Sequence, residues 1–172
     1  TKRPNPDEFE GYVESTVGDY DLGRLTAASS GPLSETVAYR LTGNVNQQDG
    51  YFDNGGGEDL NGADDWYLLG KLLYEPSDTL AFLLTGSRVD RDTHCCGADA
   101  VQSAELNAEL AARGLPIDKN DPYDYEIATD IDGEFKVTTD SLSLVADQEL
   151  SLGALKSITA WGESDGAATR DV

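Results

Sequence analysis

The sequence of 172 residues contains no methionine, a single histidine and only two cysteines, which stand side by side at Cys95 and Cys96. Basic residues are scarce as well, because 12 of them face 33 acidic ones and give a formal net charge of −21. A nucleic-acid partner needs a basic patch, and the absence of one argues against such a partner. No apolar run approaches the roughly 18–20 residues of a membrane-spanning helix.

The few residues that could carry chemistry form no recognisable site. His94 adjoins Cys95 and Cys96, but consecutive residues rarely converge on one ion, and structural zinc requires four ligands. A Cys–His nucleophile would also need an orienting partner, which the sequence does not offer. We therefore expect that the chain is not an enzyme and that it binds no metal ion and no cofactor. A disulfide that involves Cys95 and Cys96 is the favoured role, although neighbouring cysteines form a strained ring or pair outside the chain.

The chain begins with Thr1-Lys2-Arg3-Pro4 and shows no cleavable signal, since an apolar core is missing there. A protein of an oxidising compartment carries such a signal when it is complete. We therefore expect the sequence to be a piece of a longer protein.

The acidic residues are concentrated in residues 49–65 and 90–134, which together hold 18 of the 33. The simplest interpretation is that both are solvated loops. Residues 130–133 resemble the middle of a calcium loop, but Ala128 and Thr139 stand where that loop needs carboxylates. Residues 118–121 are rich in oxygen ligands, so incidental calcium binding stays open.

Alternating apolar and polar residues predict β-strands, most clearly after Pro32. Apolar residues and glycine take one parity and polar residues the other, so one face is apolar and one polar. The first parity holds Val37, Tyr39, Leu41, Gly43 and Val45, and the second holds Arg40, Thr42, Asn44 and Asn46. In all, we predict seven strands, at residues 9–18, 22–30, 36–48, 66–75, 79–89, 135–146 and 152–161.

The predicted strands are joined by connections of two kinds. Short turns with proline lie at residues 31–35 and 75–78, and long acidic loops lie at 49–65 and 90–134. The longest loop is expected to hold one short helix, with Asp99 as its cap and Gly114 near its end. Short turns on one side and long loops on the other are what a transmembrane β-barrel requires.

Two architectures could accommodate the apolar face. In a barrel wall it would contact lipid, and aromatic residues near the strand ends would lie at the membrane interfaces. The alternative is a secreted acidic β-sandwich that acts as a binding module, with calcium as a candidate ligand, in which the same residues form an ordinary core.

Short stretches along nearly the whole chain resemble, in the right order, a TonB-dependent outer-membrane receptor. These stretches are 1–4 (TKRP), 9–14 (FEGYVE), 17–21 (VGDYD), 30–34 (SGPLS), 38–43 (AYRLTG), 49–51 (DGY), 69–78 (LGKLLYEPSD), 92–98 (DTHCCGA) and 155–161 (LKSITAW). The resemblance implies that residues 1–8 end a plug domain or its linker. It also implies that residues 9–172 form part of a 22-stranded transmembrane barrel.

The resemblance further implies a place in the outer membrane of a Gram-negative cell and the active uptake of a scarce ligand. That ligand would be an iron–siderophore complex, cobalamin or an oligosaccharide, and energy would come from the TonB protein through a plug that this sequence lacks. The bilayer and the small ligand are then the expected partners. We expect Asp64, Asp65 and Arg88 to lie at the ligand-facing rim, with the short turns on the periplasmic side.

Overall fold

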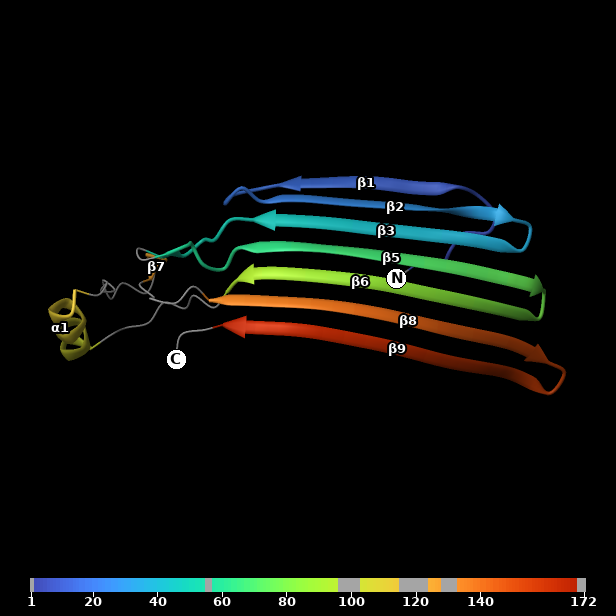
Figure 1. The fold of residues 1–172 in the computed structure, drawn as a ribbon. Helices are drawn as coiled ribbons and strands as arrows, with labels where there is room; N and C mark the ends of the chain where they lie inside the picture. Colours follow the sequence, from blue (N-terminus) through green and yellow to red (C-terminus); the bar gives the residue numbers. More distant parts are fainter. Residues whose placement is uncertain (1, 55–56, 96–102, 115–123, 128–132, 170–172) are drawn as a thin grey trace.

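Seven strands form one antiparallel sheet in the computed structural model, which describes residues 2–54, 57–95, 103–114, 124–127 and 133–169. The strands are β1 (Glu10–Val17), β2 (Gly23–Ser34), β3 (Val37–Gln48), β5 (Ala63–Ser77), β6 (Leu80–His94), β8 (Glu134–Leu150) and β9 (Gly153–Thr169). Each strand pairs with the next one in that order, and Figure 1 shows the sheet as a single layer. The predicted all-β meander of seven strands is confirmed.

Three smaller elements, β4, α1 and β7, lie in the loops at one end of the sheet (Figure 1). β4 (Asp53–Asn54) pairs in parallel with β7 (Glu126–Ile127), and α1 (Ala104–Ala112) is the predicted short helix. Ser103 caps this helix, because its side chain accepts a hydrogen bond of 3.2 Å from the backbone N–H of Leu106. Asp99, the predicted cap, lies outside the described residues. In the part of the chain that is described, no helix has the length and apolar character needed to cross a membrane.

The strands extend further toward the loops than the sequence predicts. β5 starts at Ala63, β6 continues to His94 and β9 continues to Thr169, where we expected boundaries at residues 66, 89 and 161. Charged residues had been assigned to loops, but in the sheet they pair with opposite charges on neighbouring strands. Arg91 contacts Asp65 at 3.3 Å and Lys136 contacts Asp92 at 3.2 Å, so the ladder continues through polar cross-strand pairs.

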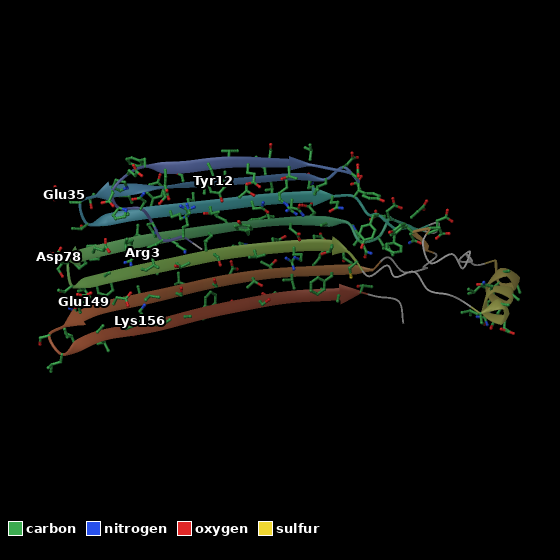
Figure 2. The ribbon with its side chains drawn as sticks, turned by 180° about the vertical axis from the view of Figure 1, so that it is seen from behind. Arg3, Tyr12, Glu35, Asp78, Glu149 and Lys156 are labelled. Carbon is green, nitrogen blue, oxygen red and sulfur yellow. The ribbon has the colours of Figure 1, made fainter. Side chains whose placement is uncertain are left out.

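The prolines lie in the strands and not in the turns, which corrects the sequence-based prediction. Residues 35–36, 78–79 and 151–152 form the turns, each of two residues. Pro32 and Pro76 fall where the register shifts near the ends of β2 and β5. A proline donates no ladder hydrogen bond, so a bulge accommodates it without loss. Figure 2 shows Glu35, Asp78 and Glu149 together at this turn end of the sheet.

The pairing registers give the sheet two chemically different faces, because residues paired across strands point to the same side. The apolar face carries Leu25, Tyr39, Leu41, Val45, Trp66, Leu68, Leu72, Tyr74, Phe82, Leu84, Leu142, Leu144 and Trp161. The polar face carries Glu10, Arg24, Thr26, Ser30, Arg40, Asn44, Asn46, Lys71, Thr85, Ser87, Ser141 and Ser143. Leu41 and Val45 on the apolar face are half exposed.

Residues 2–8, which we call the strap, run across the polar face (Figure 1). Pro4 in the middle of the strap is buried. Ala38, Leu73 and Ser30 on the same face are almost completely buried, although the sheet is a single layer. The strap therefore covers them, and the main packed region of the sheet lies on its polar face.

Candidate functional site

Three loops at one end of the sheet are hydrogen-bonded into one assembly, which we call the loop unit. The N–H of Asp49 donates to the carbonyl of Tyr20 at 2.9 Å and so joins the β1–β2 loop to the β3–β5 loop. The N–H of Asn61 donates to the carbonyl of His94 at 2.6 Å, at the end of β6. Strand β4 and its partner β7 then attach the loop that follows β6. The loops thus have positions fixed relative to one another.

Aromatic rings form the centre of the loop unit. The ring of Tyr51 lies 6.1 Å from that of Tyr20, 5.2 Å from that of Phe52 and 6.3 Å from that of Tyr125. Phe52 and Leu60 are buried, so this cluster is a small core separate from the one beneath the strap. Ring pairs at such distances add to the free energy gained by burial alone.

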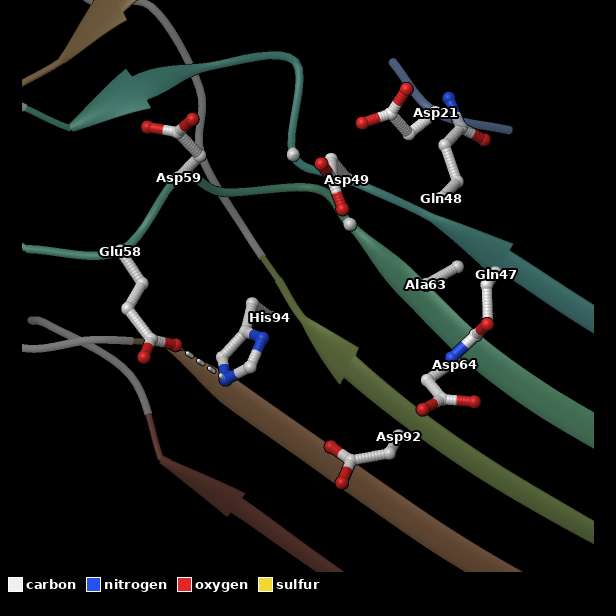
Figure 3. A pocket seen from close by; sticks show the side chains of 12 residues that line it. Asp21, Gln47, Gln48, Asp49, Glu58, Asp59, Ala63, Asp64, Asp92 and His94 are labelled. Carbon is white, nitrogen blue, oxygen red and sulfur yellow. Dashed lines mark ion pairs between the residues drawn. The ribbon is translucent and has the colours of Figure 1, made fainter. Parts of the chain in front are cut away.

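An acidic pocket of about 510 Å³ opens between the loop unit and the strand ends (Figure 3). Its carboxylates come from four separate stretches of the chain and are Asp21, Asp49, Glu58, Asp59, Asp64 and Asp92. Gln47, Gln48 and His94 complete the polar lining. The register of β3, β5 and β6 brings these residues together, because Gln47 pairs with Asp64 and Asp64 with Asp92.

The charge in this pocket is strongly one-sided. Among the residues that line it, none is Lys or Arg, and His94 is the only group that can become a cation. Its Nε2 lies 3.2 Å from Oε2 of Glu58, a contact marked by the dashed line in Figure 3. The Oδ1 atom of Asp92 is buried and accepts no hydrogen bond in the described part of the chain. Such a pocket attracts cations and repels anions.

The described non-glycine residues with left-handed backbone conformations lie in the same region. Tyr20, Asp21, Asn61 and Tyr125 are the described non-glycine residues with positive φ, at 58°, 50°, 65° and 55°. Asp and Asn tolerate this conformation, whereas it is uncommon for a bulky Tyr. Each costs on the order of 1–3 kcal/mol and persists only where surrounding contacts impose it. The aromatic cluster supplies these contacts for Tyr20 and Tyr125.

The three predicted rim residues lie near this end of the sheet, but they do not form one site. Asp64 lines the acidic pocket. Asp65 points to the polar face, where it pairs with Arg91 at 3.3 Å. Arg88 lies on the apolar face, where it pairs with Asp140 at 3.3 Å. Successive strand residues point to opposite faces, so Asp64 and Asp65 cannot contact the same ligand from one side.

Charged residues also border the apolar face at its loop end. Lys136, beyond the last apolar residue of β8, lies 2.6 Å from Glu134 and 3.2 Å from Asp92. Hydrogen bonds to Glu134 first and Asp92 second raise the pKa of its ammonium group. Lys136 therefore keeps its charge and offsets part of the acidity next to the pocket.

The remaining predicted features are only partly described. Cys95 is disulfide-bonded, while Cys96 lies outside the described residues. The calcium-like residues 130–132 and the oxygen-rich residues 118–121 also lie outside them. No group of three or more His, Cys, Asp or Glu side chains within the described ranges is arranged to hold a metal ion.

Most of the pocket was missed from the sequence, because its members are isolated acids in different loops. Only Asp64 had been named as a rim residue, and Asp21, Asp49 and His94 had not. One signal for the pocket was present in the sequence. The motif GDYD at residues 18–21 places the pocket residue Asp21 in the turn between the first two strands, directly after Tyr20. No protein-family model matches the chain, and the comparison with curated proteins finds no match either. The site is therefore interpreted from its own geometry.

Proposed function

We propose that the chain is part of the wall of a TonB-dependent outer-membrane receptor, with the strap as the end of the plug linker. The observation that carries the proposal is a continuous apolar band on one face of a single-layered sheet. On β3 the band runs from Val37 to Val45, which is nine residues. Tilted strands need about 9–11 residues to cross a bilayer.

The border of this band at the loop end crosses the strands at an angle. Trp66 on β5 pairs with Val45 on β3, and Asp64 is the next residue on that face. On β6 a charge appears earlier, at Arg88, which pairs with Leu68. The border thus lies nearer the turns on β6 than on β5. A membrane surface meets tilted strands with this kind of stagger, so the slope supports the proposal.

The polar face supports the same proposal because its chemistry suits an aqueous interior. It carries Arg24, Asn44 and Asn46 toward the loops and the strap toward the turns. The side-chain amide of Asn44 donates to the hydroxyl of Thr26 at 2.7 Å, and Arg24 donates to Asn46 at 3.0 Å. A linker that enters along this face would lead into the lumen of a closed barrel.

A β-sandwich would instead pack the apolar face against a second layer. Leu41 and Val45 keep 50% and 51% of their surface exposed, and Leu68 keeps 47%. In the described ranges the only other sheet is the pair of β4 and β7, which lies among the loops. These exposures favour a wall in contact with lipid over a core.

The acidic pocket is the described part of the chain best suited to bind cationic groups. Because Gln47, Asp64 and Asp92 lie on the same face as the apolar band, the pocket opens on that side of the wall, beyond the loop-end border of the band. Under the proposal the loop end faces outward, and the pocket opens there between fixed loops. Its carboxylates and His94 would bind a ligand that carries cationic or hydrogen-bond-donating groups. A strongly anionic ligand would need basic residues from other parts of the receptor. Uptake of an iron–siderophore complex, cobalamin or an oligosaccharide remains the proposed activity.

A flotation experiment tests the membrane assignment. The 172-residue chain is refolded with phosphatidylcholine vesicles and centrifuged through a sucrose gradient, with and without urea during loading. We expect the chain to float with the vesicles and to resist urea extraction. A chain that stays in the aqueous fraction as a monomer and unfolds cooperatively without lipid would refute the proposal and favour the sandwich.

A further inference from the structure

The strap is attached to the sheet by polar contacts with three different residues. The backbone carbonyl of Lys2 accepts a hydrogen bond of 2.9 Å from Nζ of Lys71 on β5. Arg3 pairs with Glu75 at 3.2 Å, near the turn end of the same strand. The N–H of Asn5 donates to Oγ of Ser30 on β2 at 2.9 Å. Two strands separated by β3 are therefore bridged by one short segment.

Two of these attachments are shielded from solvent and one is not. Ser30 has no exposed surface, and its hydroxyl donates in turn to the carbonyl of Tyr39 at 2.9 Å. Lys71 keeps only 9% of its surface exposed. The ion pair of Arg3 and Glu75 is exposed and contributes little. The hold on the strap therefore depends mainly on Lys71 and Ser30.

The position of Lys71 gives its contact with the strap a physical reason. Lys71 pairs across the strands with Arg40, so two cations lie side by side on the polar face. Arg40 is neutralised by Glu10, at 2.9 Å. Removing the ammonium group of Lys71 from water is costly unless polar groups replace that water. The carbonyl of Lys2 is one such group, which makes the strap part of the folded sheet.

We propose that the strap is a fixed clamp held by Lys71, and that it closes the turn-end part of the polar face over β2, β3 and β5. In the described part of the chain, the polar contacts of the strap are with β2 and β5, so the open part of the polar face lies over β6, β8 and β9. Midway along these strands Thr85, Ser87, Ser141 and Ser143 are small and uncharged, and the hydroxyls of Ser87 and Ser141 are hydrogen-bonded at 2.7 Å. Charged residues flank them on the same face, with Arg91 toward the loops and Lys156, paired with Asp147 at 3.1 Å, toward the turns.

Amide hydrogen exchange of the full chain tests whether the strap is held. In the unsubstituted chain we expect the Asn5 amide to be protected. In Lys71→Met, which keeps the length of the side chain, exchange at Asn5 should rise by about tenfold or more, as expected for losing a hydrogen bond to a charged group. Lys71→Arg should keep most of the protection. The control is Thr85→Val, since Thr85 lies next to Lys71 on β6, on the opposite side of β5 from β2 and β3.

Thiol labelling tests which half of the polar face is closed. Ala38→Cys replaces a residue with 1% of its surface exposed, and Ser141→Cys replaces an exposed residue of the open half. A charged thiol reagent should label Ser141→Cys rapidly and Ala38→Cys slowly. In the double variant Ala38→Cys with Lys71→Met, labelling at position 38 should become faster. Unprotected Asn5 in the unsubstituted chain, or equal labelling at both positions, would overturn the clamp. Protection of the β3 amides in each variant serves as the control that the sheet is still folded. The flotation experiment tests the membrane proposal separately, so failure of the clamp and failure of the proposed function can be told apart.

Discussion

The two faces of the sheet differ in which side chains they expose. The apolar face exposes apolar side chains and the polar face buries charged ones, which is the reverse of what a protein surface in water favours. On the apolar face, Leu41 and Val45 are half exposed. On the polar face, Arg40 and Lys71 keep only 8% and 9% of their surface exposed. Large exposed apolar surfaces on soluble proteins mark interaction sites, and buried charges require partners. The strap and Glu10 supply partners on the polar face, whereas no described segment covers the apolar face.

This difference indicates that the two faces have different surroundings. The polar face is built as a protein interior with its own packed segment and ion pair. Many apolar side chains on the other face, from β2 to β9, stay exposed in the described part of the chain. Under the proposed function a bilayer would cover them without any further protein, because lipid tails accept apolar side chains and charged residues border the band.

The largest difference between the two faces is expected when the same charge is placed on each face of β3. Leu41→Arg puts a cation at the centre of the apolar band, and Thr42→Arg puts it on the polar face one residue later. In vesicles we expect Leu41→Arg to lower the free energy of unfolding by about 2–4 kcal/mol, the cost of Arg at the bilayer midplane. Thr42→Arg should cost much less. Urea titration of both variants in the same vesicles provides the measurement, and equal losses would show that the faces share one environment.

A smaller effect distinguishes neighbouring leucines of β5. Leu73 is buried beneath the strap, and Leu72 is 40% exposed on the apolar face. We expect Leu73→Ala to lower the stability by about 2 kcal/mol, near the lower end for buried leucines because the strap can settle into the space. Leu72→Ala should cost about half as much. The same unfolding titration compares the two, and a larger loss at Leu72 would place the tightly packed core on the apolar face.

The smallest effect is expected at the border of the band. Arg88→Gln removes the ion pair with Asp140, in which both side chains are substantially exposed. The loss should be about 0.2–1 kcal/mol at low salt and should disappear at high salt. Arg91→Gln, which removes the pair with Asp65 on the polar face, is the matched control. A loss well above this range at Arg88 alone would move the border of the band toward the loops.

The fold was predictable where the two-residue period was clean. For β3 the predicted residues 36–48 nearly match Val37–Gln48, because apolar and polar residues alternate there without interruption. The loop ends of β5, β6 and β9 were placed too close to the turns, since charged residues such as Asp64 and Asp90 look like loop residues until their partners on the next strand are known. Local sequence carries no such information about pairing.

The site and the strap were beyond prediction for a related reason. Asp21, Asp49 and Asp92 lie far apart in the sequence, and only the register of the sheet brings them to one pocket. The contact of Lys71 with Lys2 spans 69 positions. The short helix was predictable in kind, but its cap was not, because both Asp99 and Ser103 have side chains suited to that position.

Contact between the apolar face and lipid can be measured directly through the two tryptophans of the chain, Trp66 and Trp161, which both lie on that face. The chain is refolded in phosphatidylcholine vesicles with brominated acyl chains and, in parallel, in unbrominated vesicles. Trp66→Phe and Trp161→Phe report on one tryptophan each. We predict strong quenching of both tryptophans by the brominated lipid. Equal fluorescence in the two kinds of vesicle, from a chain whose sheet is folded, would contradict the lipid-facing wall.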